Sequence, residues 1–144
     1  MPADPNENAA SDTPNDARRI IVLRGRILLA EDGRDNQRLL CAHLHDCGAE
    51  LVVAENGQIA VDLVAKSPFN LILMDMQMPV MDGYAAAAEM RRRGSTAPII
   101  ALTANAMAED RKRSMASGCT DYLTKPIDRE ILLKTVRKYL DGAT

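Results

Sequence analysis

The sequence predicts an α/β fold in which strands and helices alternate around a parallel sheet. From Arg26 onward, short apolar runs alternate with longer amphipathic segments, as in repeated strand–helix units. The third and fourth runs are apolar throughout, which is typical of strands covered on both faces, so we place them inside the sheet. The five expected strands are Arg26–Ala30, Glu50–Ala54, Leu71–Met74, Pro98–Leu102 and Asp121–Leu123.

Each expected strand is followed by an expected helix. The helices are predicted at about 36–46, after Asn56-Gly57, after Asp82-Gly83 to about 93, at about 107–117, and after Asp128, which is the N-cap of the last. Cations are favoured near helix C-termini, so we interpret Arg91-Arg92-Arg93 as a solvated helix end. The residues expected to face the core are Leu40, Leu44, Cys47, Ile59, Ala60, Leu63, Val64, Ile131, Leu132, Val136, Tyr139 and Leu140.

The 144 residues suit one domain, which we place at 25–141. Residues 1–17 are rich in Pro, Asp, Asn and Ala without periodicity and cannot bury enough apolar surface to order themselves, so 1–24 is expected to be a disordered tail or an interdomain linker. Within it, the apolar run of 18–24 is compatible with an accessory strand or an interdomain contact. Plain packing is the favoured interpretation of that run.

Composition excludes several classes of protein. The formal net charge of -2 gives no general attraction to nucleic acid or to a membrane surface, and we expect contact with neither. No apolar stretch approaches the length of a membrane span. The three cysteines show neither a disulfide framework nor zinc-site spacing, so a reducing, cytoplasmic setting is expected.

Polar residues follow four of the expected strands. Glu31 and Asp32 follow the first, Asp75 the third, Thr103 the fourth and Lys125 the fifth. The carboxyl ends of parallel strands share one edge of a sheet, so these residues should meet there. Three neighbouring carboxylates repel one another unless a cation compensates. Mg²⁺ is favoured over Ca²⁺ because no ligand-dense acidic loop is present.

This set of groups is what phosphoryl transfer to an aspartate requires. Asp75 would be the nucleophile, while Lys125 and the hydroxyl of Thr103 would bind the phosphoryl oxygens. Each residue also has a plainer interpretation when taken alone. The acidic pair would cap the following helix, Thr103 would be an ordinary loop residue, and Lys125 would be a solvated surface charge. The shared edge favours the active-site interpretation.

Four separated stretches make the chain similar to a known family: Ile27–Asp32, Leu71–Gly83, Ile100–Ala106 and Asp121–Ile127. In this order they resemble the receiver domain of two-component response regulators, and in particular the receivers attached to hybrid sensor histidine kinases. The resemblance implies a flavodoxin-like, doubly wound sheet of five strands in the order 2-1-3-4-5, with helices on both faces. Gly33 departs from the family pattern, because many members carry Asn at that position.

The resemblance also implies roles for single residues. Asp75 would be phosphorylated; Asp32 and Asp75 would bind Mg²⁺ directly, Gln77 through its backbone carbonyl and Glu31 through water. Thr103 and Tyr122 would couple phosphorylation to a change at the surface, although Tyr122 is equally compatible with a half-buried core position. The Lys125–Pro126 peptide bond would be cis.

We therefore expect a signalling module that takes a phosphoryl group from a histidine kinase or a histidine phosphotransfer protein onto Asp75 and switches partner binding. One alternative is a phosphatase or phosphotransferase with an aspartyl-phosphate intermediate, but Gln77 stands where such enzymes carry a second aspartate. Another is a receiver-like interaction domain that is not phosphorylated. Turnover by this domain alone is not expected. The chain would be either a stand-alone receiver or part of a hybrid histidine kinase, and the resemblance favours the second. A homodimer through the fourth helix, fifth strand and fifth helix is compatible with either.

Overall fold

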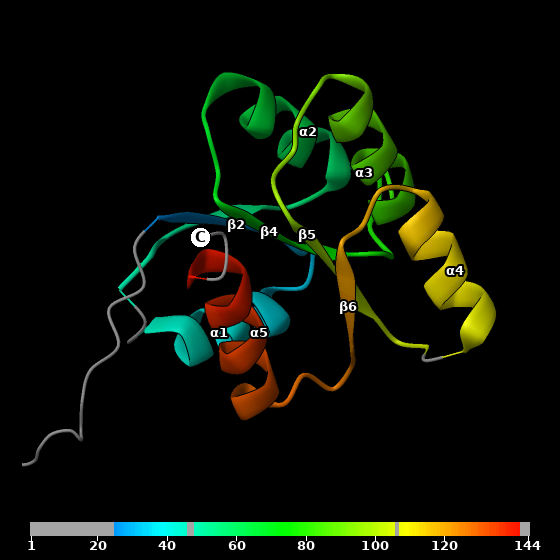
Figure 1. The fold of residues 1–144 in the computed structure, drawn as a ribbon. Coiled ribbons are helices and arrows are strands. Elements are labelled where there is room, and N and C mark those ends of the chain that lie inside the picture. Colours follow the sequence, from blue (N-terminus) through cyan, green and yellow to red (C-terminus); the bar gives the residue numbers. More distant parts are fainter. Residues whose placement is uncertain (1–24, 46–47, 106, 142–144) are drawn as a thin grey trace, which may run out of the picture.

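The computed structural model describes residues 25–45, 48–105 and 107–141. Within these residues, five strands and five helices alternate along the chain (Figure 1). In chain order they are β2 (Arg26–Ala30), α1 (Arg34–Leu44), β3 (Glu50–Ala54), α2 (Gly57–Lys66), β4 (Leu71–Asp75), α3 (Gly83–Arg92), β5 (Ile99–Thr103), α4 (Ala108–Ala116), β6 (Asp121–Thr124) and α5 (Arg129–Asp141).

The five strands form one parallel sheet in the order β3-β2-β4-β5-β6. Counted along the chain this is the order 2-1-3-4-5, so the expected flavodoxin-like topology is confirmed. β4 lies in the centre, and all five of its residues are buried. The register of β2 with β4 pairs Ala30 with Met74, and the register of β4 with β5 pairs Asp75 with Leu102. The carboxyl ends of these three strands are therefore level.

Alternate residues of the strands build two apolar cores, one on each face of the sheet. Leu28, Ile72 and Met74 point into the core under α2 and α3. Ile27, Leu29 and Leu73 point into the core under α1 and α5, where they meet residues such as Leu132. Figure 1 shows these two helix pairs on opposite faces, with α4 beside the edge strand β6. No helix in the described parts of the chain is long and apolar enough to cross a membrane.

Two expected core residues lie on the surface instead. Ile59 of α2 is 39% exposed and Ile131 of α5 is 53% exposed. In α2 the buried positions are Gly57, Ala60 and Val61, and the side chain of residue 59 leaves the helix outside that stripe. In α5 the buried stripe runs through Leu132 and Val136, about 100° of rotation away from residue 131.

Some boundaries differ from the expected ones. α1 begins at Arg34, two residues before the predicted start. β4 and β6 each end one residue later than predicted, at Asp75 and Thr124, and β5 is shifted by one residue to Ile99–Thr103. Asp128 does cap α5, because its Oδ2 accepts a hydrogen bond from the N–H of Ile131 at 3.0 Å. The apolar run of 18–24 and Cys47 lie outside the described residues.

The interpretation of Arg91 as part of a solvated helix end is wrong. Its Nε donates to the carbonyl of Gly118 at 2.9 Å, and its Nη1 donates to the carbonyls of Ser95 at 3.0 Å and Ala97 at 2.7 Å. The guanidinium therefore joins the end of α3 to the loops that enter β5 and β6. Charge and helix position alone could not predict this, because the acceptors are loop carbonyls from two other segments.

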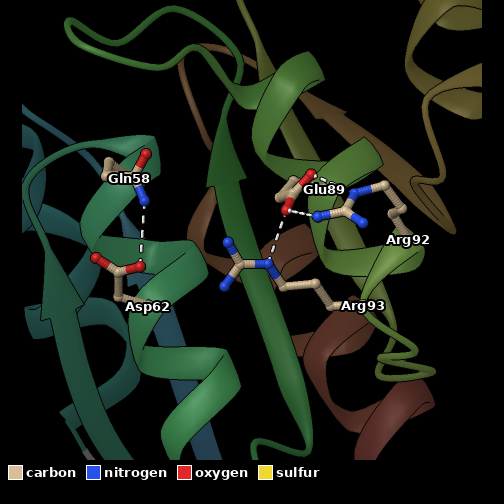
Figure 2. Close-up of polar contacts among 5 residues, drawn as sticks. All are labelled: Gln58, Asp62, Glu89, Arg92 and Arg93. Atoms are coloured by element: carbon tan, nitrogen blue, oxygen red, sulfur yellow. Dashed lines mark hydrogen bonds and ion pairs between the residues drawn. The ribbon is translucent and has the colours of Figure 1, made fainter.

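Arg92 and Arg93 do lie on the surface, as expected. Figure 2 shows both guanidinium groups directed at the carboxylate of Glu89, which accepts hydrogen bonds from each. These are pairs spaced three and four residues apart on one helix, a geometry that adds little to stability when solvent surrounds it. The three consecutive arginines thus divide into one structural residue and two solvated ones.

We expect Arg91→Ala to lower the free energy of unfolding by about 2 kcal/mol, because several loop carbonyls lose a charged hydrogen-bond donor together. Urea unfolding followed by circular dichroism measures the change. Arg92→Ala is the matched control and should shift the midpoint far less. Equal shifts for the two variants would contradict the role given to Arg91.

Candidate functional site

The register of β2 and β4 brings two carboxylates side by side. Ala30 pairs with Met74, so the next residues along each strand, Glu31 and Asp75, come level at the carboxyl edge of the sheet. Both are nearly inaccessible, with 1% and 4% of their surface exposed. Asp32 follows directly and is exposed to solvent. One carboxylate oxygen of each of the three residues lies within 4.8 Å of the others.

A close backbone contact holds this edge in place. The N–H of Gly83, at the start of α3, donates to the carbonyl of Met76 at 3.1 Å. A Cβ on residue 83 would stand 2.5 Å from the carbonyl oxygen of Asp75, so only glycine permits α3 to begin so near the end of β4. Asp82 caps the same helix by accepting from the N–H of Ala85 at 2.8 Å.

Lys125 supplies a cation to the two buried carboxylates. Its Nζ lies 3.2 Å from Oδ2 of Asp75 and 3.5 Å from Oε1 of Glu31. The residue follows β6, and its N–H donates to the carbonyl of Thr103 at 2.7 Å, which fixes its backbone against β5. The Lys125–Pro126 peptide bond is cis, as the resemblance implied. One ammonium group faces three carboxylates, so negative charge remains in excess.

Burial raises the pKa of Glu31 above its ordinary value of 4.5. The N–H of Gly33, which donates to Oε2 at 3.0 Å, opposes this rise, as does the charge of Lys125, whereas the charge of Asp75 adds to it. The other oxygen, Oε1, is buried and receives no hydrogen bond from any residue that the structure describes. The ionised form of Glu31 is thus incompletely compensated.

These features fit a hard divalent cation. The site offers only oxygen ligands, from Glu31, Asp32 and Asp75, and one buried oxygen lacks a donor. Mg²⁺ binds through one or two carboxylates together with waters, and the exposed Asp32 leaves a side open to solvent. The donor set therefore fits Mg²⁺.

The hydroxyl groups expected to act as a switch do not contact the carboxylates in this structure. Thr103 Oγ1 shares hydrogen bonds of 3.2 Å with the backbone N–H and carbonyl of Asn105. The hydroxyl of Tyr122 accepts from Arg111 of α4 at 2.8 Å. Gln77 lies in the loop after β4, where its N–H donates to Oδ1 of Asp75 at 3.1 Å.

An open cavity of about 480 Å³ lies at the same edge of the sheet, although Asp75 itself is not among its lining residues. Its walls include Asp32, Gln77 and Thr103 from the strand ends, and Tyr84 and Arg113 from α3 and α4. The guanidinium of Arg113 lies 3.8 Å from the centre of the Tyr84 ring, a cation–π contact that joins the two helices. The cavity gives space beside the exposed carboxylate of Asp32 and the side chain of Thr103.

The sequence did not predict two residues that support the site. Gln37 of α1 donates to the carbonyl of Glu31 at 2.6 Å, and Arg111 holds the hydroxyl of Tyr122. Gln37 could have been found from its place in the first turn after the acidic pair. Arg111 could not, because its contact depends on how α4 lies against β6.

A comparison with protein families decides the identity of the fold. The family model of the response regulator receiver domain matches residues 27–137. The chain belongs to this family. The matched range includes the four stretches on which the resemblance rests.

Relatives of this receiver occur in sensor kinases and in phosphotransfer complexes. The chain is 44% identical over 119 residues to the sensor protein GacS of Pseudomonas syringae pv. syringae. This match covers 79% of this chain but only 13% of GacS. A receiver domain of the sensor histidine kinase PA1611 from Pseudomonas aeruginosa PAO1, with a magnesium ion in its active-site cleft, matches with a TM-score of 0.76 and 37% identity. That match covers 81% of this chain and 98% of the other.

A third relative was solved together with a partner. The Saccharomyces cerevisiae histidine phosphotransfer protein Ypd1 was crystallised with the receiver domain of its downstream response regulator Ssk1. The match has a TM-score of 0.81 and 30% identity and covers 85% of this chain and 93% of that one. The chain is therefore a receiver domain of two-component signalling.

We expect Glu31→Gln to raise the thermal midpoint by about 4 °C at neutral pH without divalent metal, because it removes a poorly compensated buried charge. The folded-state pKa of Glu31 is raised above 4.5, so its ionisation costs stability at higher pH, and the cost disappears as pH falls below the unfolded pKa. The difference in thermal midpoint between Glu31→Gln and wild type should therefore shrink as the pH is lowered, and calorimetry measures it. Glu55→Gln, at the exposed end of β3, is the control, and a midpoint lowered by Glu31→Gln would contradict the interpretation.

Proposed function

We propose that this receiver accepts a phosphoryl group on Asp75 in a Mg²⁺-dependent reaction and changes its binding of partners as a result. The observation that supports this most directly is the position of Asp75. Its carboxylate is buried beside Lys125 and close to two further carboxylates, at the edge of the sheet where Asp32, Gln77 and Thr103 line an open cavity.

The donor would be a phosphohistidine of a histidine kinase or of a histidine phosphotransfer protein. An oxygen of Asp75 attacks phosphorus while the bond from phosphorus to the donor's imidazole nitrogen breaks, so the product is an acyl phosphate and a free histidine. The ammonium group of Lys125 lies where it can bind a phosphoryl oxygen. The Ssk1 receiver bound to Ypd1 supports a partner of this kind.

The metal ligands would be Asp32 and Asp75, with Gln77 through its carbonyl and Glu31 through water. When bound, Mg²⁺ supplies positive charge against the phosphoryl oxygens. Glu31 and Lys125 also share an ion pair at 3.5 Å, so Glu31 orients the lysine as well. The magnesium-bound PA1611 receiver supports this set.

Gln77 argues against an enzyme with an aspartyl-phosphate intermediate. Such an enzyme needs a general acid to protonate its leaving group, and the neutral side-chain amide of Gln77 is far too weak an acid for that role. A receiver-like domain without phosphorylation is disfavoured for another reason. The buried, poorly compensated Glu31 costs stability, and a purely structural domain gains nothing from it.

The proposed switch begins at Thr103. To reach a phosphoryl oxygen, its hydroxyl has to leave the backbone of Asn105, and the loop between β5 and α4 has to move with it. α4 buries a single residue, Ser114, so little apolar packing opposes its movement. Movement of α4 would carry Arg111 away from Tyr122 and free that ring to turn.

The parent chain, the cellular location and a homodimer also belong to this proposal. The relatives favour a hybrid sensor kinase as the parent chain, and the free thiols of Cys41 and Cys119 suit the cytoplasm. A homodimer through α4, β6 and α5 is supported by exposed apolar side chains, namely Met107 just before α4, Met115 of α4 and Ile131 of α5.

We expect Asp75→Asn to reduce phosphorylation by a small acyl phosphate and Mg²⁺ at least about a hundredfold, because an amide is not a nucleophile. Intact-protein mass spectrometry measures the modified fraction. Asp62→Asn is the control, since Asp62 is an exposed residue of α2 that pairs with Gln58 (Figure 2). Full modification of the Asp75 variant would overturn the assignment, as would equal modification after removal of the metal with chelator.

We expect Thr103→Ala to separate modification from the switch. Phosphorylation of Asp75 should persist within about tenfold of wild type, because the hydroxyl is one of several phosphoryl contacts. The change in hydrogen exchange of α4 and β6 on phosphorylation should be lost. Thr124→Ala, one strand away and exposed, should retain that change. A Thr103 variant that still shows it would rule out the proposed first step.

A further inference from the structure

The cavity at the carboxyl edge carries a single positive charge on its wall. Asp32, Asp82 and Asp110 contribute carboxylates to the lining, and among the lining residues that the structure describes only Arg113 is a cation. Arg113 belongs to α4, whereas Asp32 and Thr103 lie at strand ends. The phosphoacceptor, the proposed metal ligands and the proposed switch do not use this arginine.

The guanidinium of Arg113 is positioned by an aromatic ring. Its Cζ lies over the face of the Tyr84 ring, 3.8 Å from the ring centre, at a point where α3 and α4 lie side by side (Figure 1). Tyr84 is half-buried in the first turn of α3, the helix that follows the loop from Asp75. The ring therefore holds the arginine beside the cavity.

The stack leaves the hydrogen-bond donors of Arg113 unused. A guanidinium that lies flat on a ring keeps its N–H groups in its own plane, so they are directed past the ring and not into it. No described residue forms an ion pair with Arg113. The planar fork of donors matches two oxygens of a carboxylate or a phosphate. Arg113 thus presents an anion-binding edge at the cavity.

Two residues that surround the Asp75 carboxylate also line the cavity. The N–H of Gln77 donates to Oδ1 of Asp75 at 3.1 Å, and Asp32 offers an oxygen within 4.8 Å of an oxygen of Asp75. Gln77 and Asp32 both face the cavity. A small donor with its phosphorus at Asp75 extends past these residues, so the part of the donor that leaves has space in the cavity. Arg113 is the cation that this part would meet.

The chemistry of the donor decides whether such a cation helps. When an oxygen of Asp75 attacks the phosphorus of an acyl phosphate, the bond from phosphorus to the bridging oxygen breaks and the electron pair stays on that oxygen. The acyl group departs as a carboxylate, and no proton is needed. Negative charge therefore grows on the leaving oxygen in the transition state, and a cation that binds it lowers the barrier. A phosphoramidate differs, because its protonated nitrogen departs as a neutral amine.

We propose that the cavity binds the leaving end of a small acyl phosphate, and that Arg113, held by Tyr84, binds the carboxylate that departs. The arginine then favours acyl phosphates over phosphoramidates as donors. It does not assist transfer from a phosphohistidine, whose leaving group is a neutral imidazole. This inference rests on the proposed phosphorylation of Asp75 and adds a preference among donors to it.

Two donors test this preference. Wild type and Arg113→Ala are treated with acetyl phosphate or with phosphoramidate in the presence of Mg²⁺, and intact-protein mass spectrometry gives the rates of modification. The variant should react with acetyl phosphate at least about tenfold more slowly, because a charged hydrogen bond to the leaving oxygen is lost. Its rate with phosphoramidate should stay within about twofold of wild type. Lys112→Ala, exposed on α4 and outside the cavity, is the control for charge and should match wild type with both donors.

The outcomes separate this inference from the proposed function. Equal rates for Arg113→Ala and wild type with acetyl phosphate, or an equal loss with both donors, would overturn the inference and leave the proposed function intact. No modification of wild type by either donor would instead contradict the proposed function. Arg38→Ala tests another route, because Arg38 of α1 lines a separate cavity of about 380 Å³ that also reaches Asp32. A selective loss with acetyl phosphate in Arg38→Ala alone would place the leaving group there and overturn the role of Arg113.

Tyr84 acts as a positioning residue, so its ring and not its hydroxyl should matter. Tyr84→Phe keeps the ring face and should retain the wild-type ratio of the acetyl phosphate rate to the phosphoramidate rate. Tyr84→Leu loses the stack and should lower that ratio at least about threefold. Circular dichroism checks that both variants fold. An unchanged ratio in Tyr84→Leu would overturn the role given to the ring.

Discussion

The placement of like charge at the ends of two adjacent central strands is the constraint on which the rest of the structure depends. Register between β2 and β4 puts Glu31 beside Asp75, and burial denies both the solvation that would offset their repulsion. This negative charge is offset in part by the ammonium group of Lys125 and by the backbone N–H groups of Gly33 and Gln77, which donate to the carboxylates. These leave the negative charge only partly compensated, which favours the binding of a further cation.

The helix beside this site is attached in a different way from the others. α1 and α5 bury leucine and valine against the sheet, whereas α4 buries Ser114 and is joined to its neighbours through arginine–tyrosine contacts. Arg111 meets Tyr122, and Arg113 lies on the ring of Tyr84. Contacts of this kind at an exposed surface contribute modestly and can form again after a displacement. The element nearest to Thr103 is thus among the easiest to move.

Much of the fold and the site could be predicted because the deciding signals are local. Apolar runs fix the strands, and the residues at their carboxyl ends meet wherever the strands are parallel, so Glu31, Asp75 and Lys125 were found from the pattern alone. What depends on contacts between distant segments was missed. Arg91 was interpreted as solvated although its acceptors are loop carbonyls, and Ile59 and Ile131 were placed inside although each lies a helical step away from the buried stripe. Apolar character does not by itself say which way a helix is turned.

Arg91 makes the two ends of β5 and β6 differ in how they are held. Its guanidinium binds carbonyls on the segments that lead into β5 and β6, so the starts of both strands are held to α3. At their other ends the backbones are also paired, but the side chains of Thr103 and Lys125 are held only by hydrogen bonds to a loop and by ion pairs. These side chains can exchange partners with little disturbance of the strands. Rearrangements at the acidic edge would then leave the opposite edge of the sheet in place.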